Sequence, residues 1–378
     1  AGRGASHPAD ADAVRRDAEN HAAALDRALA LGDDDLVVRL AAGLSLDWYA
    51  VGPTMAATDR LRATIATTSD HSPERAAALR ELGLSLPWSA RTDEAHAVAD
   101  ELQDIARRRH AADIEADALW VRAAIAWVQG DVAAHTDLLE RGLSLLRAID
   151  HPTLTVFLFD LASVAIRRGE FERSTQLIQE LDREGRIRHD DLAAARVSLL
   201  RSDLAFWSGD VRAAIGPATQ ALASMRTAGL IGPQSDALRS VFDIAVALGD
   251  LDLAGRAVSD HDALVMPNEV VAQSMAEIMR ARLDLECGDD ARSANQLADA
   301  LASIHQTEAT VGLDGALLVA ALQADRRSRD DLAAEIVQHR AERLAARDLV
   351  GRSRGCARCR SPTSSPSSEG PPPQPGSR

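Results

Sequence analysis

The feature that most constrains the fold is a glycine followed by an acid, which recurs at a fixed distance along the chain. Successive glycines are separated by 39, 40, 40 and 39 residues, and each stands between two Ala- and Leu-rich runs. They are Gly130, Gly169, Gly209, Gly249 and Gly288. A fixed period of roughly 20 to 50 residues indicates stacked structural repeats. The pattern therefore predicts a solenoid rather than a set of globular domains.

The same step extends the pattern beyond these glycines. Counting back 39 residues from Gly130 reaches Arg91, and 39 more reach Gly52. Counting forward about 41 residues from Gly288 reaches Arg329. We therefore expect about eight helix pairs over residues 17–349.

Each unit is expected to be two helices joined by a tight turn. A glycine just past a helix end can adopt the left-handed conformation that closes the last carbonyls. The acid after it can accept hydrogen bonds from the free N–H groups of the next helix. These acids are Asp131, Glu170, Asp210, Asp250 and Asp289.

Side-chain size is also periodic around the glycines. Five residues before each glycine stands an aliphatic residue, namely Ile125, Val164, Leu204, Ile244 or Leu283. Five residues after it stands His135, Ser174, Ala214, Ala254 or Ser293, and most of these are small. Alanine also stands four residues before four of the five glycines, and small residues at matched points on both helices allow the pair to pack closely.

These positions resemble tetratricopeptide-like helical repeats. The stretch GDVRAAIGPATQAL is similar to the second half of that motif, with Ala214 and Ala221 at its small positions and Leu222 closing it. The first half departs from the motif, because Arg201 stands where leucine is preferred. The resemblance covers roughly residues 17–347 and implies an all-α, right-handed superhelix.

Composition excludes several functions. The formal net charge is −15, which disfavours nucleic-acid binding because phosphate neutralisation requires a basic face. All basic residues are arginine, so a Walker A lysine and a Schiff-base lysine are excluded. Aromatic residues make up only 3% of the chain, and no long run alternates with period two, so no sheet is expected.

Sequence also indicates the compartment. The three cysteines, Cys287, Cys356 and Cys359, do not form a disulfide framework, which favours the cytoplasm. The N-terminal residues lack a basic-then-apolar signal sequence. The longest apolar stretch, residues 153–166, is too short to span a bilayer and contains Asp160. We expect no membrane partner.

The segment after residue 16 carries a second resemblance. The run DAENHAAALDRALALGDDDLVVRLAAGLSLDWYAVG is similar to the start of the helical-repeat region in bacterial signal-transducing ATPase regulators of the LuxR and AfsR type. The matching positions are Asp17, Asn20, Ala23, Ala24, Leu25, Gly32, Asp33, Leu40, Ala41, Trp48 and Tyr49. The resemblance implies a sensor region, with an NTPase module expected upstream and a DNA-binding module elsewhere in the full-length protein.

The N-terminal and C-terminal segments of the chain are not expected to belong to the repeats. Residues 1–16 are expected to be disordered or a linker. Residues 350–378 are rich in Arg, Ser, Pro and Gly and lack apolar residues able to form a core, so they are expected to be disordered. This tail contains a formal G-x-S-x-G match at 351–355 and a Cys-x-x-Cys pair, but neither has the context that its chemistry requires. We expect no catalytic residue, no metal site and no cofactor.

A binding surface is the remaining candidate site. In tetratricopeptide stacks the first helix of each pair lines the concave groove, and carrying this over by position gives Arg196, Asp203, Trp207, Arg239, Asp243 and Arg282. Such a lining suits a peptide or protein segment, or a small inducer. For each residue alone, a solvated surface position is the alternative. Trp120 and Trp127 lie seven residues apart and are interpreted as core residues.

The sequence favours a non-catalytic, ligand- or protein-sensing scaffold from a bacterial transcriptional or signalling regulator. The alternative is a free-standing repeat adaptor for protein assembly. A helical-repeat enzyme is a third class, which would require measurable turnover.

Overall fold

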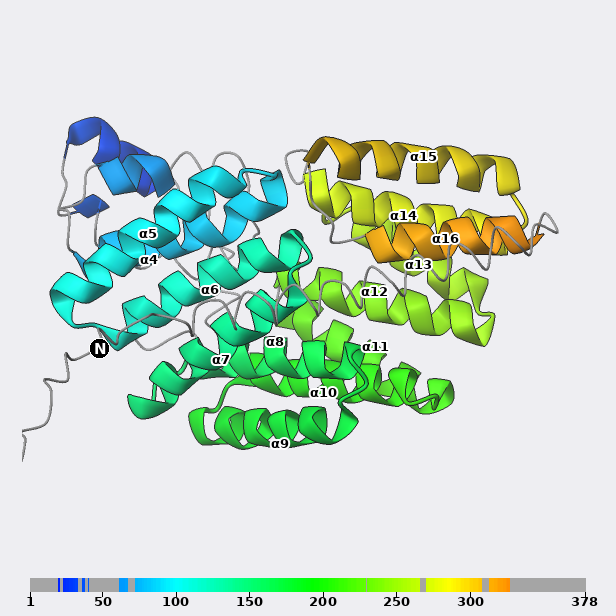
Figure 1. Cartoon of the computed structure of the whole chain (residues 1–378), viewed down its shortest axis with the longest axis horizontal. Helices are drawn as coiled ribbons and strands as arrows, with labels where there is room; N and C mark the ends of the chain where they lie inside the picture. Colours follow the sequence, from blue (N-terminus) through cyan, green and yellow to red (C-terminus); the bar gives the residue numbers. More distant parts are fainter. Residues whose placement is uncertain are drawn as a thin grey trace, which may run out of the picture.

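All the regular elements of the structure, a computed structural model, are helical in the residues that it describes (Figure 1). These residues are 20, 23–32, 36–37, 40, 61–66, 72–228, 230–265, 270–307 and 313–326. The first half contains α4 (Pro73–Ser85), the 3-10 helix η1 (Leu86–Ser89), α5 (Thr92–Arg109), α6 (Ala112–Val128), α7 (Val132–Ala148), α8 (Leu154–Arg167) and α9 (Phe171–Arg188). The second half contains α10 (Asp191–Trp207), α11 (Val211–Ala228), α12 (Ile231–Leu248), α13 (Leu251–Asp262), α14 (Val270–Glu286), α15 (Asp290–Thr307) and α16 (Leu313–Arg326). The prediction of an all-α repeat fold is confirmed.

The predicted turns join the two helices of each pair. They connect α6 to α7, α8 to α9, α10 to α11, α12 to α13 and α14 to α15, and the members of each pair pack against each other. All five glycines have a positive φ, from 71° at Gly130 to 97° at Gly209. The N–H of the next residue reaches back to the carbonyl five residues earlier, as from Asp131 to Ala126 at 2.8 Å. This bond closes the helix end as expected.

The acids after the glycines cap the following helix in four of the five turns. The carboxylates of Asp131, Asp210, Asp250 and Asp289 accept from the backbone N–H three residues later, at 2.9–3.1 Å. Glu170 instead forms ion pairs with Arg168 at 2.8 Å and Arg173 at 3.1 Å. Its side chain is one methylene longer than that of aspartate, and this explains the difference, because aspartate is the preferred acid at the N-cap.

The first described pair, α4 and α5, uses the same turn without a glycine. Ala90 adopts the left-handed conformation with φ of 56°, and α5 begins at Thr92. The N–H of Arg91 donates to the carbonyl of Leu86 at 3.0 Å, again five residues back. The predicted turn near Arg91 is therefore present. The predicted turns near Gly52 and Arg329, and both terminal segments, lie outside the described residues.

The two helices of a pair meet at matched positions, seven residues before the turn glycine and five after it. The His135 ring contacts the carbonyl of Ala123 through Nδ1 at 2.8 Å. The hydroxyl of Ser293 donates to the carbonyl of Ala281 at 2.6 Å, and Ser202 donates to Ala214 at 2.7 Å. In these three pairs a polar side chain thus contacts a backbone carbonyl of the facing helix at the seam.

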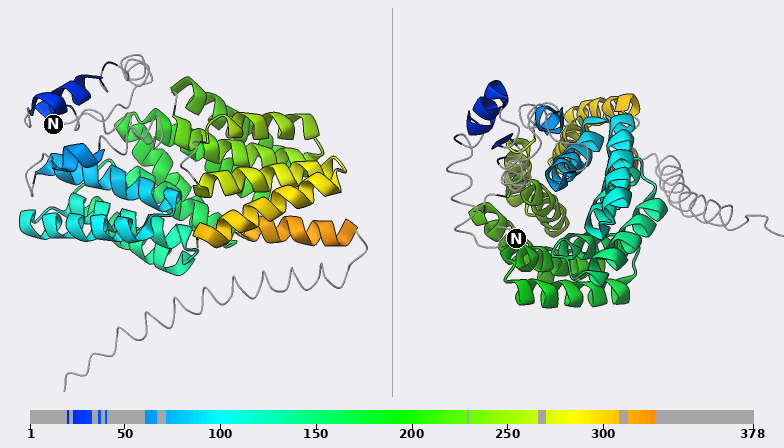
Figure 2. Two further views of the ribbon diagram at one scale, coloured as in Figure 1. Left: turned by 90° about the horizontal axis from the view of Figure 1, so that it is seen from above. Right: turned by 90° about the vertical axis from the view of Figure 1, so that its left-hand side faces the viewer.

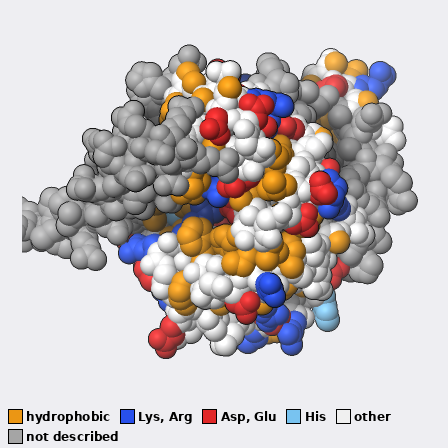
Figure 3. Space-filling view, turned by 90° about the vertical axis from the view of Figure 1, so that its right-hand side faces the viewer, with side chains coloured by type: hydrophobic (Ala, Val, Ile, Leu, Met, Phe, Trp, Pro, Cys, Tyr) orange, Lys and Arg blue, Asp and Glu red, His pale blue; other side chains and the backbone are white. Residues whose placement is uncertain are grey.

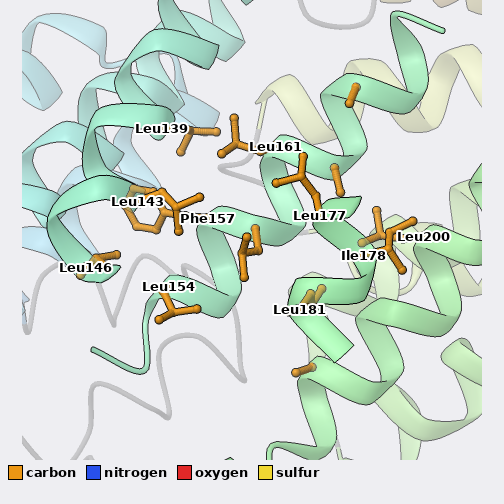
Figure 4. Close-up of a cluster of buried hydrophobic side chains, with 14 of the residues drawn as sticks. Leu139, Leu143, Leu146, Leu154, Phe157, Leu161, Leu177, Ile178, Leu181 and Leu200 are labelled. Atoms are coloured by element: carbon orange, nitrogen blue, oxygen red, sulfur yellow. The ribbon is translucent and has the colours of Figure 1, made fainter. Parts of the chain in front are cut away.

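Aliphatic side chains fill the space between pairs. In the close-up of one cluster, Leu143, Leu146 and Leu139 of α7 face Phe157 and Leu161 of α8 (Figure 4). Gly142 allows this approach, because a Cβ there would lie 2.4 Å from the Phe157 ring. The three largest clusters in the described residues are built from adjacent pairs, as a solenoid requires.

The stack curves until distant pairs touch. Viewed end-on, the helices lie around a ring (Figure 2, right). The 3-10 helix η1 of the first described pair contacts α14, and Val128 and Val271 are buried between Trp88 and Trp127. We call these four residues the closing contact. It joins parts of the chain that no neighbour-to-neighbour stacking would bring together.

The turn geometry generates a first prediction. Gly249→Ala should lower the free energy of unfolding by roughly 1 kcal/mol, because an alanine must then adopt a left-handed conformation. A Cβ at Gly249 meets no atom within 4 Å, so the effect is conformational rather than steric. Ala90→Gly should act in the opposite direction. Urea unfolding measures both, and a neutral Gly249→Ala would contradict the account.

A second prediction concerns the closing contact. Val271 is 2% exposed, so Val271→Asp places an unpaired carboxylate among apolar rings and should separate η1 from α14. Small-angle scattering should show a larger radius of gyration, while far-UV circular dichroism stays unchanged. Leu301→Asp, at an exposed position on α15, is the control. Unchanged scattering from Val271→Asp would show that the ring does not depend on this contact.

Candidate functional site

The first helices of the pairs form the inner row of the stack. Helix α10 packs on both α8 and α12, and α12 also packs on α14. Charged side chains of α8 and α12, which belong to pairs two steps apart, act on one another: Arg167 is influenced by Asp236, Arg239 and Asp243. In a curved stack such residues approach only on the concave side. They therefore mark the inner face.

We call seven charged residues on this face the inner charge cluster. They come from α8, α10 and α12 and comprise four aspartates and three arginines. The members are Asp160, Arg167, Arg196, Asp203, Asp236, Arg239 and Asp243.

Asp160 lies in the most apolar part of the sequence and has a strongly shifted pKa. Burial raises its pKa to about 7, and the charge of Asp236 adds to the rise. Arg196 and a hydrogen bond from Trp120 oppose the rise without cancelling it. The carboxylate is therefore poorly compensated by its surroundings near neutral pH.

Arg167, at the end of α8, lies against an aromatic ring. Its guanidinium carbon is 5.1 Å from the centroid of the Trp127 ring, within range of a cation–π contact. The same indole lies near the His135 ring, with ring centroids 5.1 Å apart. Trp127 also belongs to the closing contact, so one side chain connects the inner charge cluster with the ring closure.

The remaining aspartates differ in their partners. Asp203 accepts a hydrogen bond from the Ser240 hydroxyl at 2.7 Å, and burial still raises its pKa. Asp236 pairs with Arg239 one helical turn later. Asp243 is exposed to solvent yet surrounded by protein, and this desolvation raises its pKa to about 6 despite Arg239 and Arg167. Exposure combined with desolvation is expected of a side chain on a concave surface.

Five of the six predicted binding residues come together on this face. Arg196, Asp203, Arg239 and Asp243 are members of the cluster, and the charge of Arg282 acts on Asp243. Arg196 is only 4% exposed and lies 5.3 Å from the Phe159 ring centroid, while Arg282 pairs with Glu286 at 2.7 Å. Their role in binding stays a prediction.

Trp207 is placed differently. It is 50% exposed at the end of α10, and its ring contacts its neighbour Phe206 edge-on, with centroids 5.8 Å apart. Phe206 packs against the apolar core.

Sequence reasoning missed Asp160, Arg167 and Asp236. A signal existed for Asp160, because an acid within an apolar helix that does not cross a membrane needs a polar partner. The core interpretation of the tryptophans is correct in part. Trp120 packs on Phe157 with ring centroids 5.7 Å apart, but it also reaches Asp160.

The described ranges contain neither a metal-binding cluster nor a membrane-spanning helix. No group of three His, Cys, Asp or Glu residues there is arranged to hold a metal ion. None of the helices in the same ranges has both the length and the apolar character to cross a bilayer.

Comparison with known proteins identifies the fold. No family model matches the sequence, and no curated protein sequence matches it. A Rap protein complexed with competence and sporulation factor has a similar structure, with a TM-score of 0.54 and 12% identity over 87% of this chain and 99% of that chain. NprR in complex with its cognate peptide NprX gives a TM-score of 0.52 and 12% identity over 86% and 88%. The chain has the fold of a tetratricopeptide-like helical-repeat solenoid.

The shifted pKa of Asp160 predicts how stability depends on pH. Between pH 4 and 7 the folded chain holds a proton on Asp160 that the unfolded chain has lost, so stability falls as pH rises through this window. Asp160→Asn removes the effect and should match the parent near pH 4. At pH 8 it should be more stable by roughly 1 to 2 kcal/mol, which is less than the full shift because water reaches part of the group.

Urea unfolding at several pH values measures this difference. Asp137→Asn, on the exposed face of α7, is the matched control and should change little at any pH in the series. A difference between Asp160→Asn and the parent that stays constant from pH 4 to 8 would contradict the prediction.

Proposed function

We propose that the chain is a non-catalytic sensor that binds a peptide, or a linear segment of a protein, on its inner face. The observation that carries this proposal is the convergence of the inner charge cluster from three successive pairs. Charged and aromatic side chains on a concave surface suit an extended chain with polar groups along its length. Rap and NprR, which share the fold, were solved in complex with competence and sporulation factor and with the cognate peptide NprX, respectively.

The sequence resemblance extends the proposal to the full-length protein. In that form the chain is the sensor region of a bacterial transcriptional or signalling regulator, with an NTPase module upstream. Peptide binding favours one curvature of the stack, and this bias shifts the NTPase between inactive and active arrangements. The closing contact supports this mechanism, because Trp127 takes part in it and also contacts Arg167 of the inner face.

A free-standing adaptor is the second candidate. Hydrophobic side chains gather between charged ones on the face drawn in Figure 3, and Trp207 and Leu248 are exposed at helix ends. An adaptor would use such outer surfaces to hold folded partners. The location of the binding surface therefore distinguishes the two candidates.

The test is selection of random phage-displayed peptides on the purified chain, followed by calorimetric titration with the selected peptides. The double variant Asp203→Asn/Asp236→Asn should weaken binding at least about tenfold, because it removes two of the four carboxylates that make the inner face attractive to the cationic groups of a peptide. Asp137→Asn/Asp182→Asn, on the outer helices α7 and α9, should retain the parent affinity. Equal binding by both variants would place the peptide elsewhere and favour the adaptor.

A further inference from the structure

Arg167 differs from the other arginines that lie among carboxylates. Arg80, between α4 and α6, pairs with Glu81 at 2.8 Å and with Asp117 at 3.5 Å. Arg168, the next residue in the chain, pairs with Glu170 at 2.8 Å. Arg167 forms no ion pair with any described residue, although it lies near three aspartates of α10 and α12. Its guanidinium lies over the Trp127 ring, 5.1 Å from the ring centroid.

The three aspartates near Arg167 differ in their hydrogen bonds and ion pairs. Asp203 accepts from Ser240, and Asp236 pairs with Arg239. Asp243 forms neither a hydrogen bond nor an ion pair within the described part of the chain, and it is exposed to solvent. One guanidinium and one carboxylate, two pairs apart on the inner face, therefore have no ion-pair partner among the described residues.

The geometry of Arg167 suits a particular ligand group. A guanidinium is planar and offers parallel N–H donors that match the two oxygens of a carboxylate. Stacking on Trp127 restricts the plane of the guanidinium, so less side-chain entropy is lost when it binds. Asp243 is an acceptor, and an ammonium or guanidinium group is its complement. Surrounding protein strengthens both interactions relative to open solvent.

We propose that Arg167, held on the Trp127 ring, binds a carboxylate of the peptide, and that Asp243 binds a cationic group of the same peptide. This inference rests on the proposed function and specifies its ligand as a linear peptide that carries both charges. The carboxylate is supplied by the C-terminus or by an acidic side chain, since both present the same two oxygens.

The test uses a random hexapeptide library made in two forms, one with a free C-terminal carboxylate and one amidated. Each form is incubated with the purified chain, bound peptides are separated by size exclusion, and they are sequenced by mass spectrometry. Peptides that carry an acidic group together with arginine or lysine should be enriched at least about tenfold over neutral ones. Enrichment that survives amidation identifies an acidic side chain, and enrichment lost on amidation identifies the C-terminus.

Matched variants test which residue binds the carboxylate of the peptide and which binds its cationic group. Arg167→Gln should lose the preference for the carboxylate and keep that for the cationic group, and Asp243→Asn should do the reverse. Arg167→Lys should restore part of the carboxylate preference, because it keeps the charge without the planar donors. Arg141→Gln, exposed on the outer helix α7, should behave as the parent. Thermal unfolding and circular dichroism confirm that each variant is folded.

The outcomes separate this inference from the proposed function. Peptides that bind the parent with no charge preference, or with one that Arg167→Gln leaves intact, would overturn the inference and leave the peptide sensor standing. If neither library form yields bound peptides, the proposed function fails, and the assignment of Arg167 and Asp243 fails with it.

Discussion

A pair of helices has too little partner surface to bury its own apolar face, and this constraint organises the whole molecule. Each pair therefore stacks on the next, and the glycine turn sets the same geometry in every unit. Because the geometry repeats, residues at matched positions fall in rows that run from pair to pair. The inner charge cluster is a set of such rows, which the curvature of the stack brings together. Apolar packing thus determines which charged side chains meet.

Charged side chains are less well compensated on the inner face than on the outer face. Exposed arginines on the outer helices find acids in the neighbouring pair, as Arg147 does with Glu180 at 2.6 Å. On the inner face, burial raises the pKa of Asp160, Asp203 and Asp243, so their charged forms are disfavoured. Apolar residues there would stabilise the stack at least as well. Retaining poorly compensated charges is therefore consistent with a surface that acts on a ligand.

Much of the fold could be predicted from the sequence because the relevant signals are local. The glycine and the acid after it specify a turn within a few residues, and the period located even the turn at Ala90, which lacks the glycine. The candidate site was predicted less completely. Arg167 and Asp236 belong to pairs two steps apart, and their proximity depends on a superhelical curvature that no local motif encodes. Trp127 could be recognised as buried, but its contact with Val271 follows from the same curvature.

The contact between η1 and α14 changes the character of the stack. In an open solenoid the terminal units have one neighbour and fray independently of the rest. Here Trp88 and Val271 are far apart in the sequence, so their contact is expected to form late, after the local pairs have assembled. Once it exists, loss of an early unit also removes support from a late one. The repeats are therefore expected to unfold cooperatively, so that destabilising a unit at one end of the array also destabilises a unit at the other end.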